Sequence, residues 1–117
     1  MKKDDEQSAK EILLEKILDE QICLLTLTMV SYGEMHIEYA QACYKMAEFY
    51  LEYKNLPKQA EKHCQNGFNT MKNVKENKTS SDNECNKVYM ALYYLKGRIS
   101  TILKRLALDK LFISWFY

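Results

Sequence analysis

The chain has 117 residues, the size of one small domain. Its 17 basic and 16 acidic residues leave a formal net charge of +1, so no clustered basic surface is indicated for binding nucleic acid or an anionic membrane. Three glycines and one proline supply little of the turn chemistry that sheets require, which favours an all-α protein.

The beginning of the sequence does not resemble a secretory signal. Residues 1–6 are charged and are not followed by the apolar segment of a signal peptide. The longest early apolar run, residues 22–30, contains two threonines and is too short to span a bilayer. We therefore expect a cytoplasmic protein without a membrane span, whose residues 1–7 are disordered.

A long helix is predicted from Ser8 to about Val30. Ser8 with Glu11 three residues later has the spacing of a capping box. The helix carries one apolar stripe, formed by Leu14, Leu18, Ile22, Leu25, Met29 and Tyr32. The stripe is either a coiled-coil seam or a face that docks on the following helices. It is shorter than the roughly three to four heptads of a confident coiled coil, which favours docking.

Residues 31–36 separate this helix from the next. Gly33 is suited to a left-handed helix end, and Ser31 with Glu34 has capping-box spacing. His36 is a metal ligand or base, or else it caps or packs the turn between helices. We favour the turn.

Residues 32–71 predict a pair of amphipathic helices joined by a short turn at residues 55–57. Side chains recur at +3 and +4 on both helices: Ile37, Ala40, Cys43, Tyr44, Ala47, Tyr50 and Leu51, then Ala60, Cys64, Gly67, Met71 and Val74. The small residues Ala47, Ala60 and Gly67 let the helix backbones approach each other. Such a helical hairpin buries one side against itself and needs neighbours on the other.

The cysteines do not form a metal-binding motif. The four thiols, Cys23, Cys43, Cys64 and Cys85, occur about once per predicted helix and never as C-x-x-C. They are expected to be small buried hydrophobes in a reducing compartment, although a Cys43–Cys64 disulfide across the hairpin is conceivable. His63 adjoins Cys64, but neighbouring helical positions point about 100° apart, so no zinc site and no cofactor is expected.

Residues 72–84 are polar and predict a flexible loop. Ser81 with Glu84 then starts a last helix. Its apolar stripe is formed by Val88, Leu92, Leu95, Ile99, Ile102 and Leu106. The tail, residues 107–117, is hydrophobic and includes Leu111, Phe112, Ile113, Trp115 and Phe116. It folds back on the last helix, mediates a dimer, or belongs to a truncated or alternatively terminated product.

The hairpin resembles a known repeat. C-x-x-M-A-x-x-Y, counted from Cys43, followed by Ala60, Cys64 and Gly67, resembles the tetratricopeptide repeat. More specifically, the sequence is similar to the tetratricopeptide repeat protein 23 and 23-like family, over roughly residues 21–102. The similarity is carried by Y-G-x-x-H (32–36), A-x-A (40–42), M-A-x-x-Y-L (46–51), N-L-P-x-Q-A-x-x-H (55–63) and A-L-Y-Y-x-x-G (91–97).

The resemblance and the periodicity disagree on the last helix. Alignment with the family places Gly97 at the small packing position, with Lys96 and Ser100 on the buried face. The period instead buries Leu92, Leu95 and Ile99. We prefer the period, because burial of an unpaired lysine is costly.

The resemblance implies a protein-binding scaffold. In tetratricopeptide repeats the first helix of each hairpin lines a concave groove, which here places Gln41, Tyr44, Glu48, Leu51 and Glu52 in a candidate peptide groove. A tyrosine beside two carboxylates would suit a peptide with Lys or Arg. Glu48 and Glu52 are equally what a solvated helix face displays. The family also implies association with the ciliary base, Hedgehog signalling and the cytoskeleton.

No motif predicts catalysis. The sequence contains no nucleophile elbow, phosphate-binding glycine loop or H-E-x-x-H, so we expect that the protein is not an enzyme. Three alternatives to a peptide-binding scaffold remain. They are a self-associating helical module, a kinesin-light-chain-like adaptor for acidic or Trp-containing cargo peptides, and a non-functional short product with too few repeats to bury a continuous core.

Overall fold

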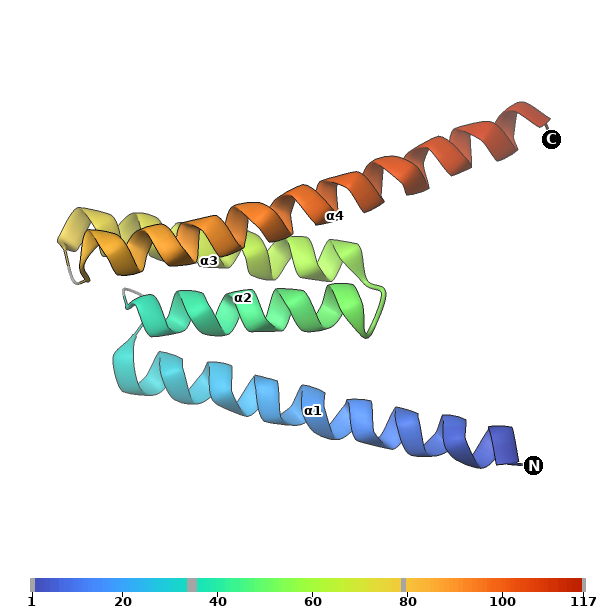
Figure 1. Cartoon of the computed structure of the whole chain (residues 1–117), viewed down its shortest axis with the longest axis horizontal. Coiled ribbons are helices and arrows are strands. Elements are labelled where there is room, and N and C mark those ends of the chain that lie inside the picture. Colours follow the sequence, from blue (N-terminus) through green and yellow to red (C-terminus); the bar gives the residue numbers. More distant parts are fainter. Residues whose placement is uncertain (1, 34–35, 79, 117) are drawn as a thin grey trace.

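The structure, a computed structural model, describes residues 2–33, 36–78 and 80–116, and these are almost entirely helical. The four helices are α1 (Lys2–Tyr32), α2 (Ile37–Glu52), α3 (Pro57–Asn77) and α4 (Asp82–Phe116). The prediction of an all-α fold, with a helical hairpin between two long helices, is confirmed (Figure 1).

The helices stack in the order of the chain. α2 and α3 form the antiparallel hairpin, α1 packs against α2, and α4 packs against both α3 and α2. The outer helices lean away from the hairpin, so that the first part of α1 and the last part of α4 project beyond it (Figure 1). The core therefore lies between α2, α3 and the first half of α4.

Small residues at the centre of the hairpin permit this packing. Ala47 and Ala60 are fully buried, as predicted. Gly67 faces α4 as well as α2, because a Cβ built on it would lie 2.9 Å from Leu92 Cδ2 and 3.5 Å from Cys43 Cβ. Pro57 occupies the first turn of α3, where its missing N–H has no helical partner.

The helix ends follow local signals in the sequence. Gly33 has a φ of +83° and its amide donates to Met29 O at 2.9 Å, the left-handed end predicted for α1. The Glu84 amide donates to Ser81 Oγ at 3.3 Å, which confirms the predicted cap of α4. The predicted pairing of Ser31 with Glu34 lies outside the described residues.

The period on α4 predicts burial correctly and the family alignment does not. Leu92, Leu95 and Ile99 are at most 2% exposed. Lys96, Gly97 and Ser100 are all exposed. The cost of burying an unpaired ammonium group accounts for this register.

Two predicted helix boundaries are wrong, the start of the first helix and the end of the third. α1 begins at Lys2 and not at Ser8, because residues 2–7 are mostly helix formers and Asp5 and Glu6 lie near the positive end of the helix. α3 continues to Asn77 because Val74 is buried in the core, so the loop predicted over 72–84 is much shorter. α4 continues through residues 107–116 without folding back, since this segment contains no glycine or proline. The sequence-based division into a tetratricopeptide-like helical domain, residues 8–106, and a hydrophobic tail, residues 107–117, stays a prediction.

α1 docks on α2, as favoured from its stripe, but only along part of that stripe. Leu14, Leu18 and Leu25 are half-buried. Ile22 and Met29 are each 43% exposed and Tyr32 is 51% exposed. In the described part of the chain, no helix combines the length and apolar character needed to cross a membrane.

Candidate interaction surface

The predicted groove residues lie on α2, and four of the five face outward. Gln41 and Glu52 are exposed, and Tyr44 and Glu48 are half-buried. Leu51 is only 4% exposed and belongs to the core. Its placement in the groove is wrong, because its side chain is already enclosed by the packed helices.

Tyr44 and Glu48 form a pair along one face of α2. The Tyr44 hydroxyl donates to the Glu48 carboxylate, which is four residues ahead and so lies on the same face. This hydrogen bond, together with partial burial and the negative charges of Glu48 and Glu52, raises the pKa of Tyr44 to about 12. The hydroxyl therefore stays protonated at physiological pH and remains a donor.

Glu52 is paired with a residue of α4. Its Oε1 lies 2.6 Å from the Arg98 Nη1, and the two side chains are 37% and 38% exposed. The Arg98 guanidinium also lies 5.9 Å from the centre of the Tyr94 ring. The hydrogen bond to Glu52 raises the pKa of Arg98 further. α2 and α4 thus share one surface on which a cation sits between a carboxylate and an aromatic ring.

Arg98 and Tyr94 were missed by the sequence reasoning. Arg98 and Glu52 are 46 residues apart, and no periodicity within one helix connects them. A signal was present in A-L-Y-Y-x-x-G, because the resemblance gives α4 the same role as α2, and Arg98 directly follows that motif. Beside Arg98, a shallow hollow of about 540 Å³ is lined by Tyr93, Tyr94, Gly97, Arg98, Thr101 and Ile102.

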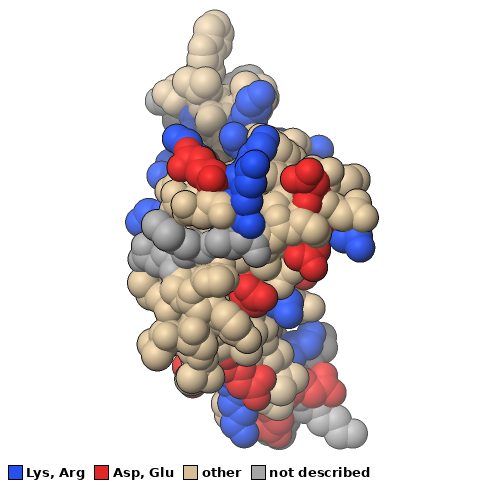
Figure 2. Space-filling model, turned by 90° about the vertical axis from the view of Figure 1, so that its left-hand side faces the viewer, with Lys and Arg blue, Asp and Glu red and all other residues tan. Residues whose placement is uncertain are grey.

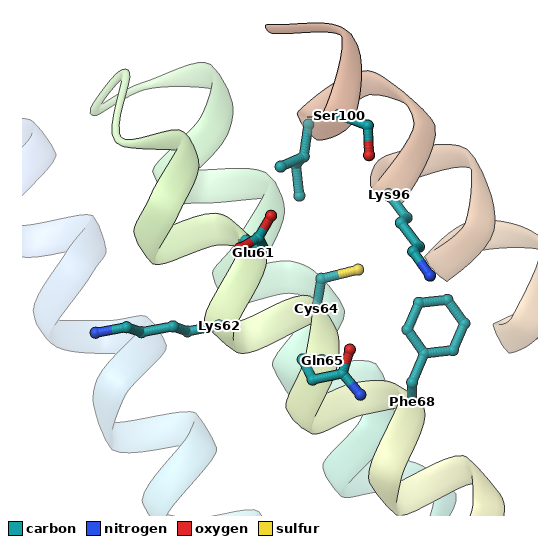
Figure 3. A pocket seen from close by; sticks show the side chains of 8 residues that line it. Glu61, Lys62, Cys64, Gln65, Phe68, Lys96 and Ser100 are labelled. Carbon is teal, nitrogen blue, oxygen red and sulfur yellow. The ribbon is translucent and has the colours of Figure 1, made fainter. Parts of the chain in front are cut away.

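A second hollow, of about 310 Å³, lies between α3 and α4. Figure 3 shows Cys64 and Phe68 of α3 facing Lys96 of α4, whereas Lys62 points away. The Lys96 Nζ lies 5.4 Å from the centre of the Phe68 ring. An ammonium group, an aromatic ring and a thiol therefore converge here without forming an acid–base pair.

Three of the four thiols are buried as expected, and Cys23 is not. All four cysteines, which lie in the described part of the chain, are free, so the Cys43–Cys64 disulfide is absent; Cys43, Cys64 and Cys85 are buried and Cys23 is exposed. Burial raises the pKa of Cys43 to about 11 and also raises that of Cys64. The Cys64 thiol donates to Leu92 O at 3.6 Å. Protonated thiols are poor nucleophiles and poor metal ligands.

The two histidines pack against aromatic rings. The His36 ring lies 5.9 Å from that of Tyr32, so His36 packs the turn as favoured, although its side chain makes no capping hydrogen bond to the described residues. His63 stacks on Tyr50 with ring centres 5.3 Å apart and planes within 4°. Its Nδ1 is buried without a hydrogen-bond partner among the described residues, and burial lowers its pKa.

Charge and metal-binding groups are dispersed. Acidic and basic side chains alternate on the face shown in Figure 2, with wide uncharged areas between them. Within residues 2–33, 36–78 and 80–116, no group of three His, Cys, Asp or Glu side chains is arranged to hold a metal ion.

Comparison with known proteins supports the resemblance seen in the sequence. The chain is 35% identical over 80 residues to "Tetratricopeptide repeat protein 23-like" of Mus musculus, a match covering 67% of this chain and 18% of that protein. It is 27% identical over 84 residues to "Tetratricopeptide repeat protein 23" of Mus musculus, covering 72% of this chain and 17% of that protein.

The chain spans less than a fifth of the length of either curated relative. No protein-family model and no solved structure matches it. The helical hairpin, the exposed face shared by α2 and α4, and these two matches lead to one conclusion: the chain is a relative of the tetratricopeptide repeat proteins 23 and 23-like.

Proposed function

We propose that the chain is a non-enzymatic protein-interaction module that binds a peptide segment of a partner on the shared face of α2 and α4. The observation that carries this proposal is the contact between Glu52 and Arg98, which joins the two helices into one polar and aromatic surface. The relationship to tetratricopeptide repeat proteins supports a scaffold role.

The chemistry of this surface suits a partner with a basic side chain. Tyr44, Glu48 and Glu52 offer two carboxylates beside a hydroxyl, and Tyr94 offers an aromatic face for a cation. Arg98 already makes the contacts with Glu52 and Tyr94 that an arginine of the partner would make. A basic peptide must therefore displace Arg98 from Glu52, and the affinity of the surface depends on that exchange.

Because of this exchange, substitutions of Glu52 and of Arg98 should change the peptide affinity in opposite directions. We would titrate the full chain with fluorescent peptides of Arg-rich and of acidic, Trp-containing sequence and follow polarisation. Glu52→Gln should lower the affinity for the Arg-rich peptide by about tenfold, because a charge-assisted hydrogen bond to the peptide is lost. Arg98→Gln should raise the affinity for the Arg-rich peptide, because the Glu52 carboxylate is then released from its ion pair with Arg98.

Glu61→Gln is the matched control, because Glu61 is an exposed carboxylate on α3, away from this surface. It should leave the affinity unchanged. Equal weakening by Glu52→Gln and Glu61→Gln would reduce the effect to net charge and contradict the site. Selective binding of the acidic, Trp-containing peptide would favour the kinesin-light-chain-like adaptor instead.

We further propose that the partner belongs to the cilium or the cytoskeleton and takes part in Hedgehog signalling. The support is the family resemblance of residues 21–102 alone. Fluorescently tagged chain should concentrate at the ciliary base of ciliated cells, and Glu52→Gln should disperse it. An even distribution of the tagged wild-type chain would contradict this placement.

A further inference from the structure

α4 carries a second stripe, distinct from the one that it buries in the core. Successive helical residues are turned by about 100°, so the members of this stripe, named below, fall within a narrow arc of the helix opposite the buried Leu95 and Ile99. The stripe consists of Tyr93, Gly97, Ser100, Lys104, Leu108, Leu111 and Trp115, all of which are exposed. Its residues from Lys104 to Trp115 are left exposed by the hairpin. At the other end of the stripe the Tyr93 ring lies 4.8 Å from that of Phe68 on α3, and Ser100 borders the hollow between α3 and α4.

The first half of the stripe holds the small residues Gly97 and Ser100 after Tyr93, and the second half holds large apolar residues. A Cβ built on Gly97 would meet no described atom within 4 Å outside the neighbouring helix backbone, so the surface there is open. Leu108 is 64%, Leu111 62% and Trp115 89% exposed. Large apolar side chains so exposed on one helical face are typical of an interaction surface.

The stripe is symmetric about Lys104. Gly97 and Leu111 are each seven residues from it, and Ser100 and Leu108 are each four. Tyr93 and Trp115 are each eleven residues from it. A second copy of the helix, reversed about Lys104, therefore places every large residue of one copy opposite a small or flat residue of the other.

We propose that a second copy of this chain packs antiparallel on this stripe, with a two-fold axis at Lys104. Leu111 of one copy fills the opening over Gly97 of the other, Leu108 lies on Ser100, and Trp115 lies against Tyr93. Each contact occurs twice, as in any two-fold interface. A parallel arrangement would set Leu111 against Leu111 and leave both glycines facing each other across a gap.

Lys104 is compatible with its place at the axis. A lysine side chain packs its methylene groups on apolar surface while its ammonium group remains in water. The two ammonium groups extend to opposite sides of the helix pair and keep their hydration. Mutual repulsion at the axis is then weak, because water screens exposed charges.

The size of the contact sets its strength. The stripe covers 22 residues of rise, from Tyr93 to Trp115, or about 33 Å at ~1.5 Å per residue. One helix pair of that length buries less than the ~800 Å² per partner of a standard interface. We therefore expect a dimer with a Kd on the order of micromolar. The stripe adjoins the hollow beside Arg98 through Tyr93 and Gly97. It does not include Tyr44, Glu48 or Glu52, so substitutions at Leu111 and at Glu52 test the two proposals separately.

Cysteine cross-linking tests the proposed orientation directly. In a Cys23→Ser background, which removes the exposed native thiol, Gly97→Cys and Leu111→Cys chains are prepared separately and then mixed under mild oxidation. A cross-linked dimer is expected in the mixture and in neither single sample. Cross-linking of each chain with itself would show a parallel pair, and no cross-link in the mixture would equally overturn the proposal.

Sedimentation equilibrium tests whether the dimer forms without cross-linking. The wild-type mass should rise toward twice the monomer over micromolar concentrations, and Leu111→Lys should hold it at the monomer value. Leu27→Lys is the matched control, because Leu27 on α1 is also 62% exposed. Circular dichroism verifies that each variant is folded. A wild-type chain that stays monomeric, or dimers lost in Leu27→Lys but kept in Leu111→Lys, would contradict the proposal.

Discussion

The two halves of α4 differ in what surrounds them more than in what they contain. Residues 82–103 pack Leu92, Leu95 and Ile99 into the core, at most 2% exposed. The half that follows is equally apolar, yet Leu111 is 62% and Trp115 89% exposed. The hairpin of α2 and α3 accompanies only the first half (Figure 1). The comparison shows that an apolar helix face becomes core only where another element reaches it.

The largest expected effect is a difference in the free energy of unfolding between substitutions in the two halves of α4. Leu92→Ala should destabilise the chain by about 2–5 kcal/mol, because it removes a fully buried side chain and leaves a cavity. Leu111→Ala should change the stability of the monomer by less than about 0.5 kcal/mol, because Leu111 is exposed. Urea unfolding at low concentration measures both. Equal losses would mean that residues 104–115 are packed in solution.

A pair of glycines sharpens the same contrast. Gly67→Val should cost about 1–3 kcal/mol, because a Cβ there lies 2.9 Å from Leu92 Cδ2, so the fully buried leucine must shift. Gly97→Ala should stabilise the monomer by up to about 1 kcal/mol, because the site is open and alanine favours helix. Thermal unfolding gives the sign of each change, and destabilisation by Gly97→Ala would refute the open surface.

Acid should weaken the hairpin through His63. Burial lowers the pKa of this imidazole below its ordinary value of 6.5, so the unfolded chain takes up the proton more readily. The contribution of His63 to stability is present above pH 6.5 and is lost as the pH falls below it. His63→Phe keeps a ring on Tyr50 but has no proton to gain. The free energy of unfolding of the His63→Phe variant should fall less than that of the wild type between pH 7 and pH 5. Equal decreases in the two proteins would contradict the role of His63 in acid sensitivity.

The smallest effect is expected at the interaction surface. Arg98→Gln should change stability by less than about 1 kcal/mol, because the Arg98–Glu52 pair is 38% and 37% exposed and is screened by water and salt. A double-mutant cycle with Glu52→Gln isolates the pair. A coupling well above that value would make the pair a structural element and weaken its assignment as a displaceable contact.

Periodicity predicted the parts of the fold that depend on burial. The hairpin and the register of α4 followed from apolar spacing, since the positions of Leu92, Leu95 and Ile99 leave only one face that buries no charge. The helix ends were predicted less well. The polar residues 72–77 looked like a loop, although the spacing of apolar residues already placed Val74 on the stripe of this helix. The structure buries Val74 and continues the helix through these residues.

The candidate site was predicted on one helix only. Tyr44, Glu48 and Glu52 were assigned through the resemblance, which concerns the first helix of the hairpin, whereas Arg98 is brought to Glu52 by the packing of α4. Leu51 was assigned to the groove through the resemblance, but the packed helices enclose its side chain. Contacts between distant segments depend on crossing geometry, which spacing along one helix does not encode.

Hydrogen exchange across α4 tests the central contrast most directly. At low concentration, amides of residues 88–102 should exchange slowly, as part of the core, and those of residues 106–115 should exchange rapidly. Raising the concentration into the micromolar range should protect residues 106–115 while residues 88–102 stay unchanged. Slow exchange along the whole of α4 at low concentration would contradict the account, because the second half would then be held by its own chain.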